Sequence, residues 1–273
     1  MKEKQSRQSI PTGVPIMRKT LAALSLFALA LPAFAQDQVR IGVEGNYPPF
    51  SQVSPDGTLS GFDIDIANAV CAQMKANCTL VQQEWDGMIP ALAANKFDMI
   101  VASMTITDER KKVVDFSDPY YDVPSRFIAA EGAFEGYSPE ELAGKTIIVL
   151  RNSPRAQYLE ATYPDSRILA VDREPAVYLE LAAGRGDIAF GSSVVSAEAF
   201  LKQPEGEGFE QVGETLTLTD SVDGGVGIAM RKGDEALKTR VNEALAAIME
   251  DGSYAKMAAQ YFDFDITPPH ARK

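Results

Sequence analysis

The sequence predicts an α/β protein made of two doubly wound lobes that are joined by two hinge strands. Three observations support this prediction. A series of alternating strand-like and helix-like segments occurs twice, turn-rich residues separate the two series, and a chain of 273 residues is long enough for two ordinary domains. Alternating strands and helices favour right-handed crossovers and a mainly parallel sheet, so two series predict two sheets.

The first 35 residues are predicted to be a secretory signal peptide. Two basic residues precede an apolar run at 21–31, and Ala33-Phe34-Ala35 fits a small-x-small cleavage site. The alternative, a membrane anchor, is disfavoured because the run is much shorter than the roughly 20 residues needed to span a bilayer. We therefore expect an exported, soluble protein, with the mature chain starting near Gln36.

The first series begins with residues 39–43, which alternate in polarity as a strand does. Apolar residues then recur at helical spacing from Phe62 to Met74. The series continues with a strand at 78–81, a helix over 85–94 and a buried strand at 98–101. These segments form a βαβαβ unit.

The second series repeats this order. Strands are expected at 145–150, 167–171 and 187–190, with helices over 153–163 and 174–183. The tail adds a strand at 227–230 and helices over 234–250 and 254–262. The tail has no partner series of its own, so we expect it to complete the first lobe.

The turn-rich breaks at 116–124 and 217–225 are predicted to be the two crossings between the lobes. These crossings divide the mature chain into three parts. The predicted boundaries are 36–122 for the first part of lobe 1, 126–222 for lobe 2, and 226–268 for the part that completes lobe 1.

Composition excludes several function classes. Lys and Arg number 26 against 38 Asp and Glu, so the chain carries a net charge of −12, and an acidic chain repels phosphate backbones. Nucleic-acid binding is therefore disfavoured. The single histidine, His270, rules out a His-Glu-x-x-His zinc site and a histidine-based triad in the body of the chain.

No cofactor or metal is expected. Gly144-Lys145-Thr146 looks like the end of a phosphate-binding loop. Such a loop needs glycine where Pro139 stands, and it follows a strand rather than preceding one. Neighbouring acids such as Asp63 and Asp65 are interpreted as helix caps or solvated side chains. Little in the sequence therefore indicates a catalytic site.

Candidate ligand-binding residues follow the ends of the predicted strands, where ligands bind in doubly wound sheets. In order along the chain they are Glu44, Tyr47, Trp85, Ser103, Thr105, Arg110, Ser153 and Ser192. An arginine can donate two charge-assisted hydrogen bonds to one carboxylate, which suits Arg110 to an anionic group.

Each candidate also has an ordinary structural explanation. Tyr47 and Trp85 fit core aromatics, Arg110 fits a surface ion pair, and the two serines fit helix N-caps. The functional interpretation is favoured because nearly all of these residues follow strand ends in the same series.

Cys71 and Cys78 are the only cysteines, and we expect them to form a disulfide in the oxidising space to which the protein is exported. Cys71 lies late in a predicted helix and Cys78 opens the next strand. A loop of this size contributes about 2–3 kcal/mol on the chain-entropy model. A redox-active or metal-binding pair is the weaker alternative because the spacing is not Cys-x-x-Cys.

Several motifs resemble the polar amino acid family of periplasmic solute-binding proteins. The motifs are Gly61-Phe62-Asp63-Ile64-Asp65, Trp85 to Leu92, Ser103 to Thr107 with Arg110, and Asp115 to Tyr120. The chain is most similar to the lysine/arginine/ornithine- and histidine-binding branch, whose small disulfide and closing Tyr261-Phe262-Asp263-Phe264-Asp265 motif it matches. The resemblance covers essentially the whole mature chain.

This resemblance implies a type II periplasmic binding protein fold without catalysis. It also implies a monomer that delivers an amino acid to an ABC permease in the inner membrane.

The resemblance also implies roles for the candidate residues. Arg110 would hold the α-carboxylate of the ligand, with a further contact from Ser153. Thr105 and the backbone at Ser103 would receive the α-ammonium. Tyr47 and Trp85 would enclose the side chain of the ligand, and Glu44 would face its cation.

The chain departs from the branch in the second lobe. Ser192 stands where the branch has an aspartate for the α-ammonium, Pro154 lacks an N–H, and the loop from Arg151 to Arg155 is unusually basic. We therefore expect a basic amino acid as ligand, with an opine-like, N-substituted amino acid as the alternative. Such a ligand could use Arg151 or Arg155 for its extra carboxylate.

Glu44-Gly45 and Trp85-Asp86-Gly87 also resemble the opine-binding relatives. A dehydratase on the same fold, with Glu44 as general acid, is the rival from another class.

Overall fold

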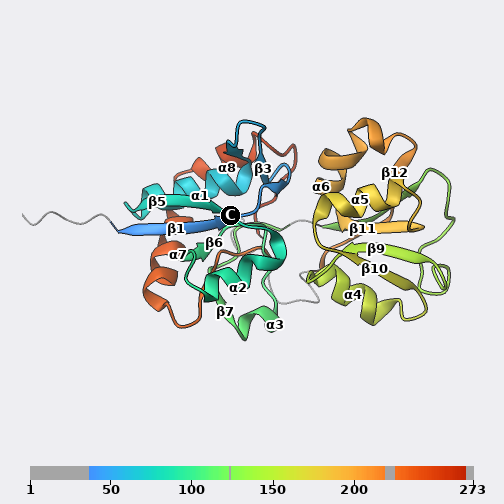
Figure 1. Ribbon diagram of the computed structural model, residues 1–273. Helices are drawn as coiled ribbons and strands as arrows, with labels where there is room; N and C mark the ends of the chain where they lie inside the picture. The colour runs from blue at the N-terminus through green and yellow to red at the C-terminus, as the bar shows by residue number, and fades with distance from the viewer. Residues whose placement is uncertain (1–36, 123, 219–224, 269–273) are drawn as a thin grey trace, which may run out of the picture. The chain divides into compact units, whose positions relative to one another are not determined.

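The first series builds a five-stranded sheet in a computed structural model that describes residues 37–122, 124–218 and 225–268. Its strands are β1 (Gln38–Val43), β5 (Asn77–Gln82), β6 (Met99–Ile100), β7 (Val114–Phe116) and β13 (Ala229–Arg231). They lie in the order β5-β1-β6-β13-β7. We call this sheet and its helices lobe 1 (Figure 1).

Helices cover this sheet because packing their apolar faces on it removes both surfaces from water. They are α1 (Phe62–Gln73), α2 (Met88–Ala93), α3 (Asp108–Lys111), α7 (Glu235–Glu250) and α8 (Ser253–Ala258). Helix α1 packs on β1 and β5 and against α7 and α8, whereas α2 contacts β6 and β13. The tail therefore completes lobe 1, as predicted.

The second series builds another five-stranded sheet, which with its helices we call lobe 2. Its strands are β8 (Ser125–Ala130), β9 (Thr146–Leu150), β10 (Arg167–Val171), β11 (Ile188–Ser192) and β12 (Phe209–Leu216). They lie in the order β10-β9-β11-β8-β12. Its helices are α4 (Pro154–Thr162), α5 (Glu174–Ala182) and α6 (Ser193–Ser196), followed by short turns at Ala197–Leu201 and Pro204–Gly206.

Strand β9 shows why the sequences of these strands are continuously apolar. Ile148 and Leu150 belong to one buried cluster, and Ile147 and Val149 belong to another. Successive side chains of a strand point to opposite faces, and here both faces are buried. Figure 1 shows α4 and α5 on opposite faces of this sheet.

The α/β organisation with two sheets is confirmed, but the expectation of mainly parallel sheets is wrong. In each sheet two of the four strand pairings are antiparallel: β13 runs against β6 and β7, and β8 runs against β11 and β12. Strands β8 and β13 follow the connections between the lobes rather than a crossover helix. The handedness rule that enforces parallel pairing therefore does not apply to them.

Most predicted elements agree with the structure to within a few residues, and two helices differ more. The expected helix over 85–94 begins as a 3₁₀ turn, η1 (Trp85–Gly87), before α2. Pro90 has no N–H to donate to the carbonyl of Asp86, so a regular helix from Trp85 would lose that hydrogen bond. The last helix ends at Ala258 rather than at residue 262. A three-stranded sheet of β2 (Asn46–Tyr47), β3 (Ser51–Val53) and β4 (Leu59–Ser60) was not predicted.

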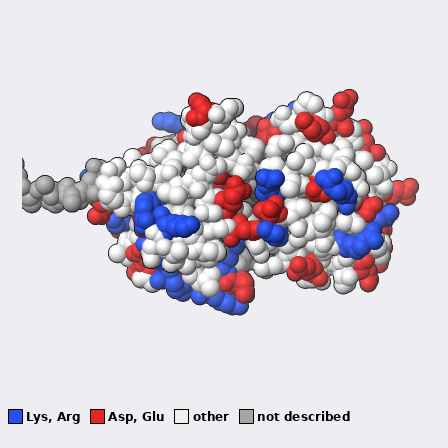
Figure 2. All heavy atoms as spheres, viewed as in Figure 1, with Lys and Arg blue, Asp and Glu red and all other residues white. Residues whose placement is uncertain are grey.

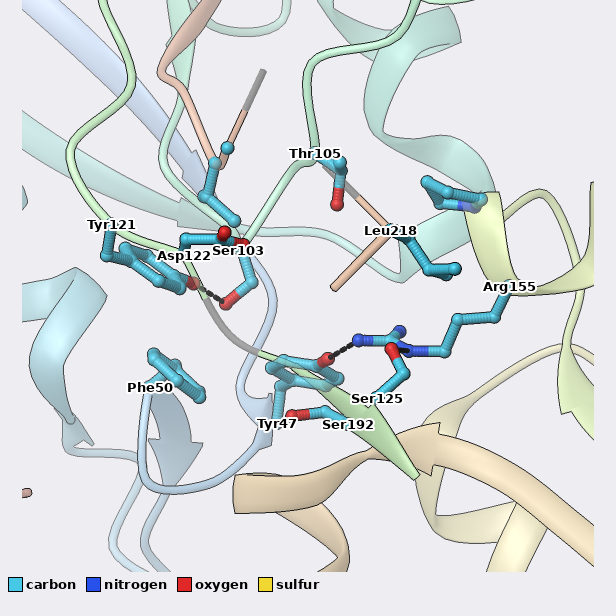
Figure 3. A pocket seen from close by; sticks show the side chains of 13 residues that line it. Tyr47, Phe50, Ser103, Thr105, Tyr121, Asp122, Ser125, Arg155, Ser192 and Leu218 are labelled. Atoms are coloured by element: carbon cyan, nitrogen blue, oxygen red, sulfur yellow. Dashed lines mark hydrogen bonds between the residues drawn. The ribbon is translucent and has the colours of Figure 1, made fainter. Parts of the chain in front are cut away.

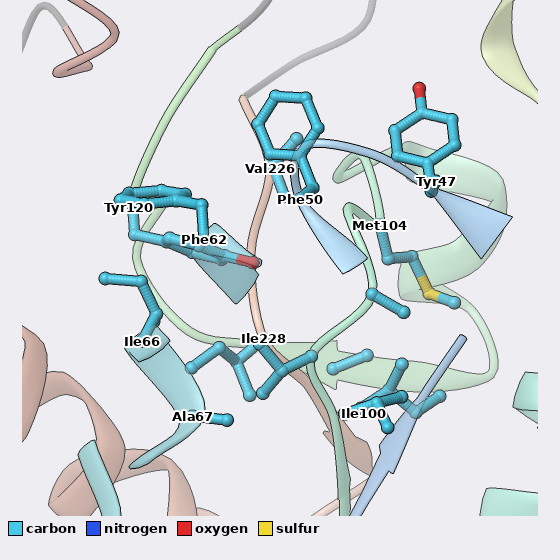
Figure 4. Packing of buried hydrophobic residues seen from close by; sticks show 14 of the residues in the cluster. Tyr47, Phe50, Phe62, Ile66, Ala67, Ile100, Met104, Tyr120, Val226 and Ile228 are labelled. Carbon is cyan, nitrogen blue, oxygen red and sulfur yellow. The ribbon is translucent and has the colours of Figure 1, made fainter. Parts of the chain in front are cut away.

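An aromatic cluster in lobe 1 packs beneath the segment that holds Tyr47 (Figure 4). Phe50 stacks on Tyr121 at 4.9 Å between ring centroids, and Phe62 meets the same ring edge-on at 5.8 Å. Phe50 and Phe62 are fully buried and Tyr121 nearly so. This packing supports Tyr47, one of the candidate ligand-binding residues, from below.

The two connections between the lobes are hydrogen bonded to each other in their described parts. Tyr120 N–H donates to the Val226 carbonyl at 2.9 Å, and Val226 N–H donates to the Tyr121 carbonyl at 2.9 Å. Beyond them, Ser125 pairs with Leu216. The predicted lobe boundaries remain predictions, and Val123 and residues 219–224 of the expected hinge lie outside the described residues.

The predicted disulfide is confirmed. Cys71 at the end of α1 is bonded to Cys78 in β5, with their Cα atoms 6.2 Å apart. The bond ties α1 to the edge strand of the first sheet.

The expected signal peptide, residues 1–35, lies outside the described residues, as does His270. Within the described ranges, no helix is both long and apolar enough to cross a membrane. Figure 2 shows acidic and basic side chains interspersed over one face, with no basic tract running across it.

Candidate ligand-binding site

All eight predicted residues line two adjoining pockets, which contain residues from both lobes. The first, here the Arg110 pocket, has a cavity volume of about 20 Å³ and is lined by Glu44, Tyr47, Trp85, Ser103, Thr105, Arg110, Ser153 and three neighbours of these residues, together with Arg155. The second, here the Ser192 pocket, has a cavity volume of about 30 Å³. The pockets share five residues, namely Tyr47, Ser103, Thr105, Pro154 and Arg155.

Arg110 is buried, with 9% of its surface exposed, and points its guanidinium into the first pocket. It donates to the Thr105 carbonyl and to the Asn152 carbonyl, each at 2.7 Å, and lies 5.1 Å from the centre of the Trp85 ring. No carboxylate pairs with it among the described ion pairs. Burial and then the charge of Arg155 lower its pKa to about 10. The predicted surface ion pair is therefore absent from the described contacts, and the guanidinium is available to an anion.

Glu44 follows β1 and is buried, with 3% of its surface exposed. Its Oε1 has no hydrogen-bond partner among the described residues. Burial raises its pKa to about 8, with further contributions from the carboxylates of Glu174, Glu84 and Asp63. A buried carboxyl without a partner is costly, so this position favours a cationic ligand group that restores the missing contact.

Tyr47 and Trp85 are also buried and line the Arg110 pocket together. The indole N–H of Trp85 donates to the Arg151 carbonyl at 3.3 Å, so this lobe 1 ring contacts lobe 2. The hydroxyl of Tyr47 accepts from Arg155 Nη2 at 3.4 Å. Both rings also belong to a buried hydrophobic core cluster, so the core interpretation holds for them together with a place in the pocket lining.

Ser103 is held by a buried network that sequence reasoning missed. Its hydroxyl donates to Asp63 Oδ2 at 2.8 Å and accepts from the Tyr121 hydroxyl at 2.6 Å, while Tyr120 donates to Asp63 Oδ1 at 2.7 Å. Asp63 has no exposed surface, so its interpretation as a cap or a solvated acid is wrong. Burial raises its pKa to about 6, against the lowering effect of these hydrogen bonds.

Ser153 and Ser192 follow strands β9 and β11 and cap the next helices. Ser153 Oγ accepts from the Ala156 N–H at 3.2 Å, and Ser192 Oγ accepts from the Val195 N–H at 3.3 Å. The N-cap interpretation is therefore confirmed for both. Each also lines a pocket: Ser153 the first and Ser192 the second.

The two basic residues of the second-lobe loop have different surroundings. Arg151 is exposed and forms an ion pair with Asp86 of lobe 1. Arg155 is partly buried, lines both pockets and donates from Nε to Ser125 Oγ at 2.9 Å. Figure 3 shows its guanidinium beside Tyr47, Ser125 and Ser192. Sequence reasoning left the two arginines undistinguished, because only the start of α4 at Pro154 decides which side chain turns inward.

Contacts between the lobes surround the Arg110 pocket. Asp86 accepts from Arg151 Nε at 2.6 Å and from Asn152 Nδ2 at 2.8 Å. With the contacts of Trp85 and Arg110 described above, these bonds join η1 and α3 to the loop after β9. Among the described residues, no group of three His, Cys, Asp or Glu side chains could hold a metal ion.

The comparison with known families identifies the chain. A match to the family described as bacterial extracellular solute-binding proteins, family 3, spans residues 39–264. The chain belongs to this family. The resemblance to periplasmic solute-binding proteins is thereby confirmed.

Several similar proteins are named for the basic amino acids that they bind. The L-arginine-binding protein of Pseudomonas aeruginosa is 45% identical over 249 residues, which cover 90% of this chain and 96% of that protein. The lysine/arginine/ornithine-binding periplasmic protein of Escherichia coli is 38% identical, over 92% of this chain and 99% of its own length. The structure of an ancestral arginine-binding protein bound to arginine is 35% identical, with a TM-score of 0.76, and the match covers 83% of this chain and 99% of that one. The predicted periplasmic binding protein fold is confirmed by this similarity.

Proposed function

We propose that this family member is the extracytoplasmic binding component of an ABC importer for a basic amino acid, such as arginine, lysine, ornithine or histidine. One observation carries the proposal. A buried guanidinium, Arg110, and a buried carboxyl without a partner, Glu44, line the same small pocket between residues of both lobes. An amino acid with a cationic side chain supplies one group of opposite charge to each.

The remaining residues complete this pose. The α-carboxylate of the ligand binds Arg110, and its α-ammonium binds Thr105 and the backbone at Ser103. Tyr47 and Trp85 enclose the aliphatic part of the ligand side chain. Closure of the two lobes around the ligand excludes water, and the low local dielectric strengthens each contact. Relatives named for arginine and for lysine, arginine and ornithine support the ligand class.

A thermal-shift panel tests the proposal. The exported protein is unfolded and refolded to remove bound ligand. Its unfolding midpoint is then measured with each of the four basic amino acids and with glutamine and glutamate. A ligand at a hundred times its dissociation constant adds about 2.7 kcal/mol of stability, which raises the unfolding midpoint visibly. No shift with any basic amino acid contradicts the proposal.

Substitution of the two pocket charges locates the site. Arg110→Gln is expected to weaken arginine binding by about 100-fold, because charge-assisted hydrogen bonds to the carboxylate are lost. The matched control is Arg240→Gln, which removes an exposed ion pair between α7 and Asp37. Titration calorimetry on the control is expected to give the wild-type affinity, and circular dichroism checks that both variants fold.

The partner and the compartment follow from this proposal. We expect a periplasmic monomer that docks to an inner-membrane ABC permease after removal of residues 1–35. Light scattering coupled to gel filtration tests the monomer, and N-terminal sequencing of the exported protein tests cleavage before Gln36.

A dehydratase is the second candidate, because Glu44 has the raised pKa of a general acid. Turnover of prephenate or arogenate that is lost in Glu44→Gln would support it. Absence of turnover, together with tight binding of a basic amino acid, leaves the binding protein.

A further inference from the structure

A groove in lobe 2 lies apart from the ligand pockets. Its cavity volume is about 420 Å³, and it shares no described lining residue with the Arg110 or the Ser192 pocket. Sites for small molecules have volumes of about 300–1,000 Å³, so the groove has room for a ligand of its own. We call it the tyrosine groove, because Tyr137, Tyr158 and Tyr163 line it together with Phe127 and Glu214.

Three parts of lobe 2 supply the four aromatic rings of this groove. Phe127 belongs to β8, Tyr137 to the loop before β9, and Tyr158 and Tyr163 to α4 and its end. The Tyr137 ring is nearly parallel to the Phe127 ring, with 6.3 Å between centroids, and the Tyr163 ring meets Phe127 edge-on at 5.7 Å. Tyr158 lies 6.2 Å from Tyr163. Because the rings are clustered in this way, a group in the groove contacts several of them at once.

Strand β12 is irregular where it borders the groove. Its register on β8 shifts between Val212 and Leu216, and Gly213 has a φ of +72°, a left-handed conformation. A Cβ atom at Gly213 would lie only 3.2 Å from the Tyr137 ring. Arg126 Nη2 donates to the Gly213 carbonyl at 2.9 Å and holds this segment in place. A glycine inside a strand marks a close approach to the backbone, and here it admits the Tyr137 ring.

The loop that carries Tyr137 is also held in place. The Tyr163 hydroxyl donates to the Tyr137 carbonyl at 2.9 Å, which joins the loop to the end of α4. The Ser138 N–H donates to Glu141 Oε2 at 2.9 Å, and the Glu141 N–H donates to Ser138 Oγ at 3.3 Å. The groove is therefore preorganised, which lowers the cost of ordering side chains when a ligand binds.

Glu214 carries the only formal charge among the described residues that line the groove. It is exposed, and no described ion pair includes it. The hydroxyls of Tyr137 and Tyr163 donate to backbone carbonyls, so neither is free to donate to an anion. The faces of aromatic rings attract cations, as does the carboxylate. The net charge of −12 acts in the same direction.

We propose that the tyrosine groove is a second binding site, which takes a small organic cation of the quaternary ammonium class. The cation lies against the rings of Tyr137 and Tyr158, with the carboxylate of Glu214 at the edge of the groove. A quaternary ammonium suits these rings because it has no N–H that needs a hydrogen-bond acceptor. The site goes beyond the proposed function, since it lies within one lobe and outside the pockets for the amino acid.

An NMR titration of the exported protein tests the site with choline and with its neutral isostere, 3,3-dimethylbutan-1-ol. Saturating L-arginine is present, so that choline does not enter the pockets between the lobes. Choline is expected to bind with a dissociation constant of about 1 mM and to shift the backbone amide signals of Ser138, Gly213 and Glu214. The alcohol should bind at least about 5-fold more weakly because it lacks the charge. Equal binding of the two compounds overturns the inference.

Two pairs of variants separate the ring and the charge from a structural role. Tyr158→Leu should weaken choline binding by about 5-fold, whereas Tyr158→Phe keeps the ring and should bind as wild type does. Glu214→Gln should weaken it by about 3-fold, and Glu207→Gln, which removes another exposed charge of lobe 2, should not. Thermal unfolding checks that each variant folds. An equal loss in Tyr158→Phe and Tyr158→Leu contradicts a role for the ring.

The titration is repeated without arginine to test whether the two sites are independent. Choline should bind with the same affinity, because the groove shares no described lining residue with the ligand pockets. Competition between choline and arginine would place choline in those pockets and overturn the inference. If the protein binds choline in the groove but no basic amino acid, the proposed function alone fails. If it binds arginine but not choline, only the second site fails.

Discussion

At the residue scale, Glu44 links ligand binding to protons. Burial raises the pKa of its carboxyl to about 8, well above the ordinary value of 4.5. The folded protein therefore holds a proton that the unfolded chain releases, and the contribution of this group to stability falls as the pH rises from 4.5 to about 8. A cationic ligand group favours the ionised form, so binding should expel the proton.

We therefore predict that affinity for arginine increases as the pH rises from 6 to about 8, with release of up to one proton. Calorimetry in buffers of different ionisation enthalpy measures the proton count. Glu44→Gln should bind arginine more weakly by at least about 10-fold, with no proton release near neutral pH, because the charged partner is gone. Proton release that persists in Glu44→Gln would assign it to another group, such as Asp63 or Glu174.

Single residues of the site also differ in how far the sequence predicts them. Glu44 and Arg110 were predictable because each follows a strand end, where the topology alone places a ligand. The burial of Asp63 and the contacts that distinguish Arg155 from Arg151 were not, because they come from Tyr120, Ser125 and other residues far away in the sequence. Whether a charge on an amphipathic helix is buried depends on its tertiary neighbours.

At the element scale, the Cys71–Cys78 bond clamps the turn between α1 and β5. It closes a short loop, so the double variant Cys71→Ser with Cys78→Ser should lose about 2–3 kcal/mol of unfolding free energy. Urea unfolding measures this loss, and adding reductant to the double variant serves as the control because it should have no further effect. The clamp is not part of either pocket lining, so the arginine dissociation constant should not change. A large change in affinity would contradict this separation of stability from binding.

The elements also differ in how far the sequence predicts them. Strands such as β9 and β10 pair with neighbours in the same series, so local periodicity and the crossover rule place them. Strands β8 and β12 pair antiparallel with each other although about 80 residues separate them, as the pairing of Phe127 with Val212 illustrates. These are the first and last strands of lobe 2 along the chain, and no local pattern encodes a pairing over such a separation. Hence the sheets were expected to be mainly parallel.

At the scale of the whole molecule, the pockets are lined by residues of both lobes, so ligand release requires contacts between the lobes to break. Asp86 is central among these contacts because it accepts hydrogen bonds from both Arg151 and Asn152. The ion pair is partly exposed, with 29% of the Asp86 side chain and 47% of the Arg151 side chain accessible. Pairs of this exposure contribute about 0.2–1 kcal/mol.

We predict that Asp86→Asn raises the rate of arginine dissociation by about 2- to 5-fold, with a smaller effect on association. Lobe contacts form after the ligand has entered, so their loss acts mainly on the exit step. The only tryptophan, Trp85, lies beside Arg110 and provides a stopped-flow fluorescence signal. Glu180→Gln is the matched control, because it removes a pair of similar exposure within lobe 2 and should leave both rates unchanged. If Asp86→Asn dissociates at the wild-type rate, the bonds of Asp86 do not limit opening, and the guanidinium of Arg110 on the Asn152 carbonyl becomes the contact that holds the lobes together.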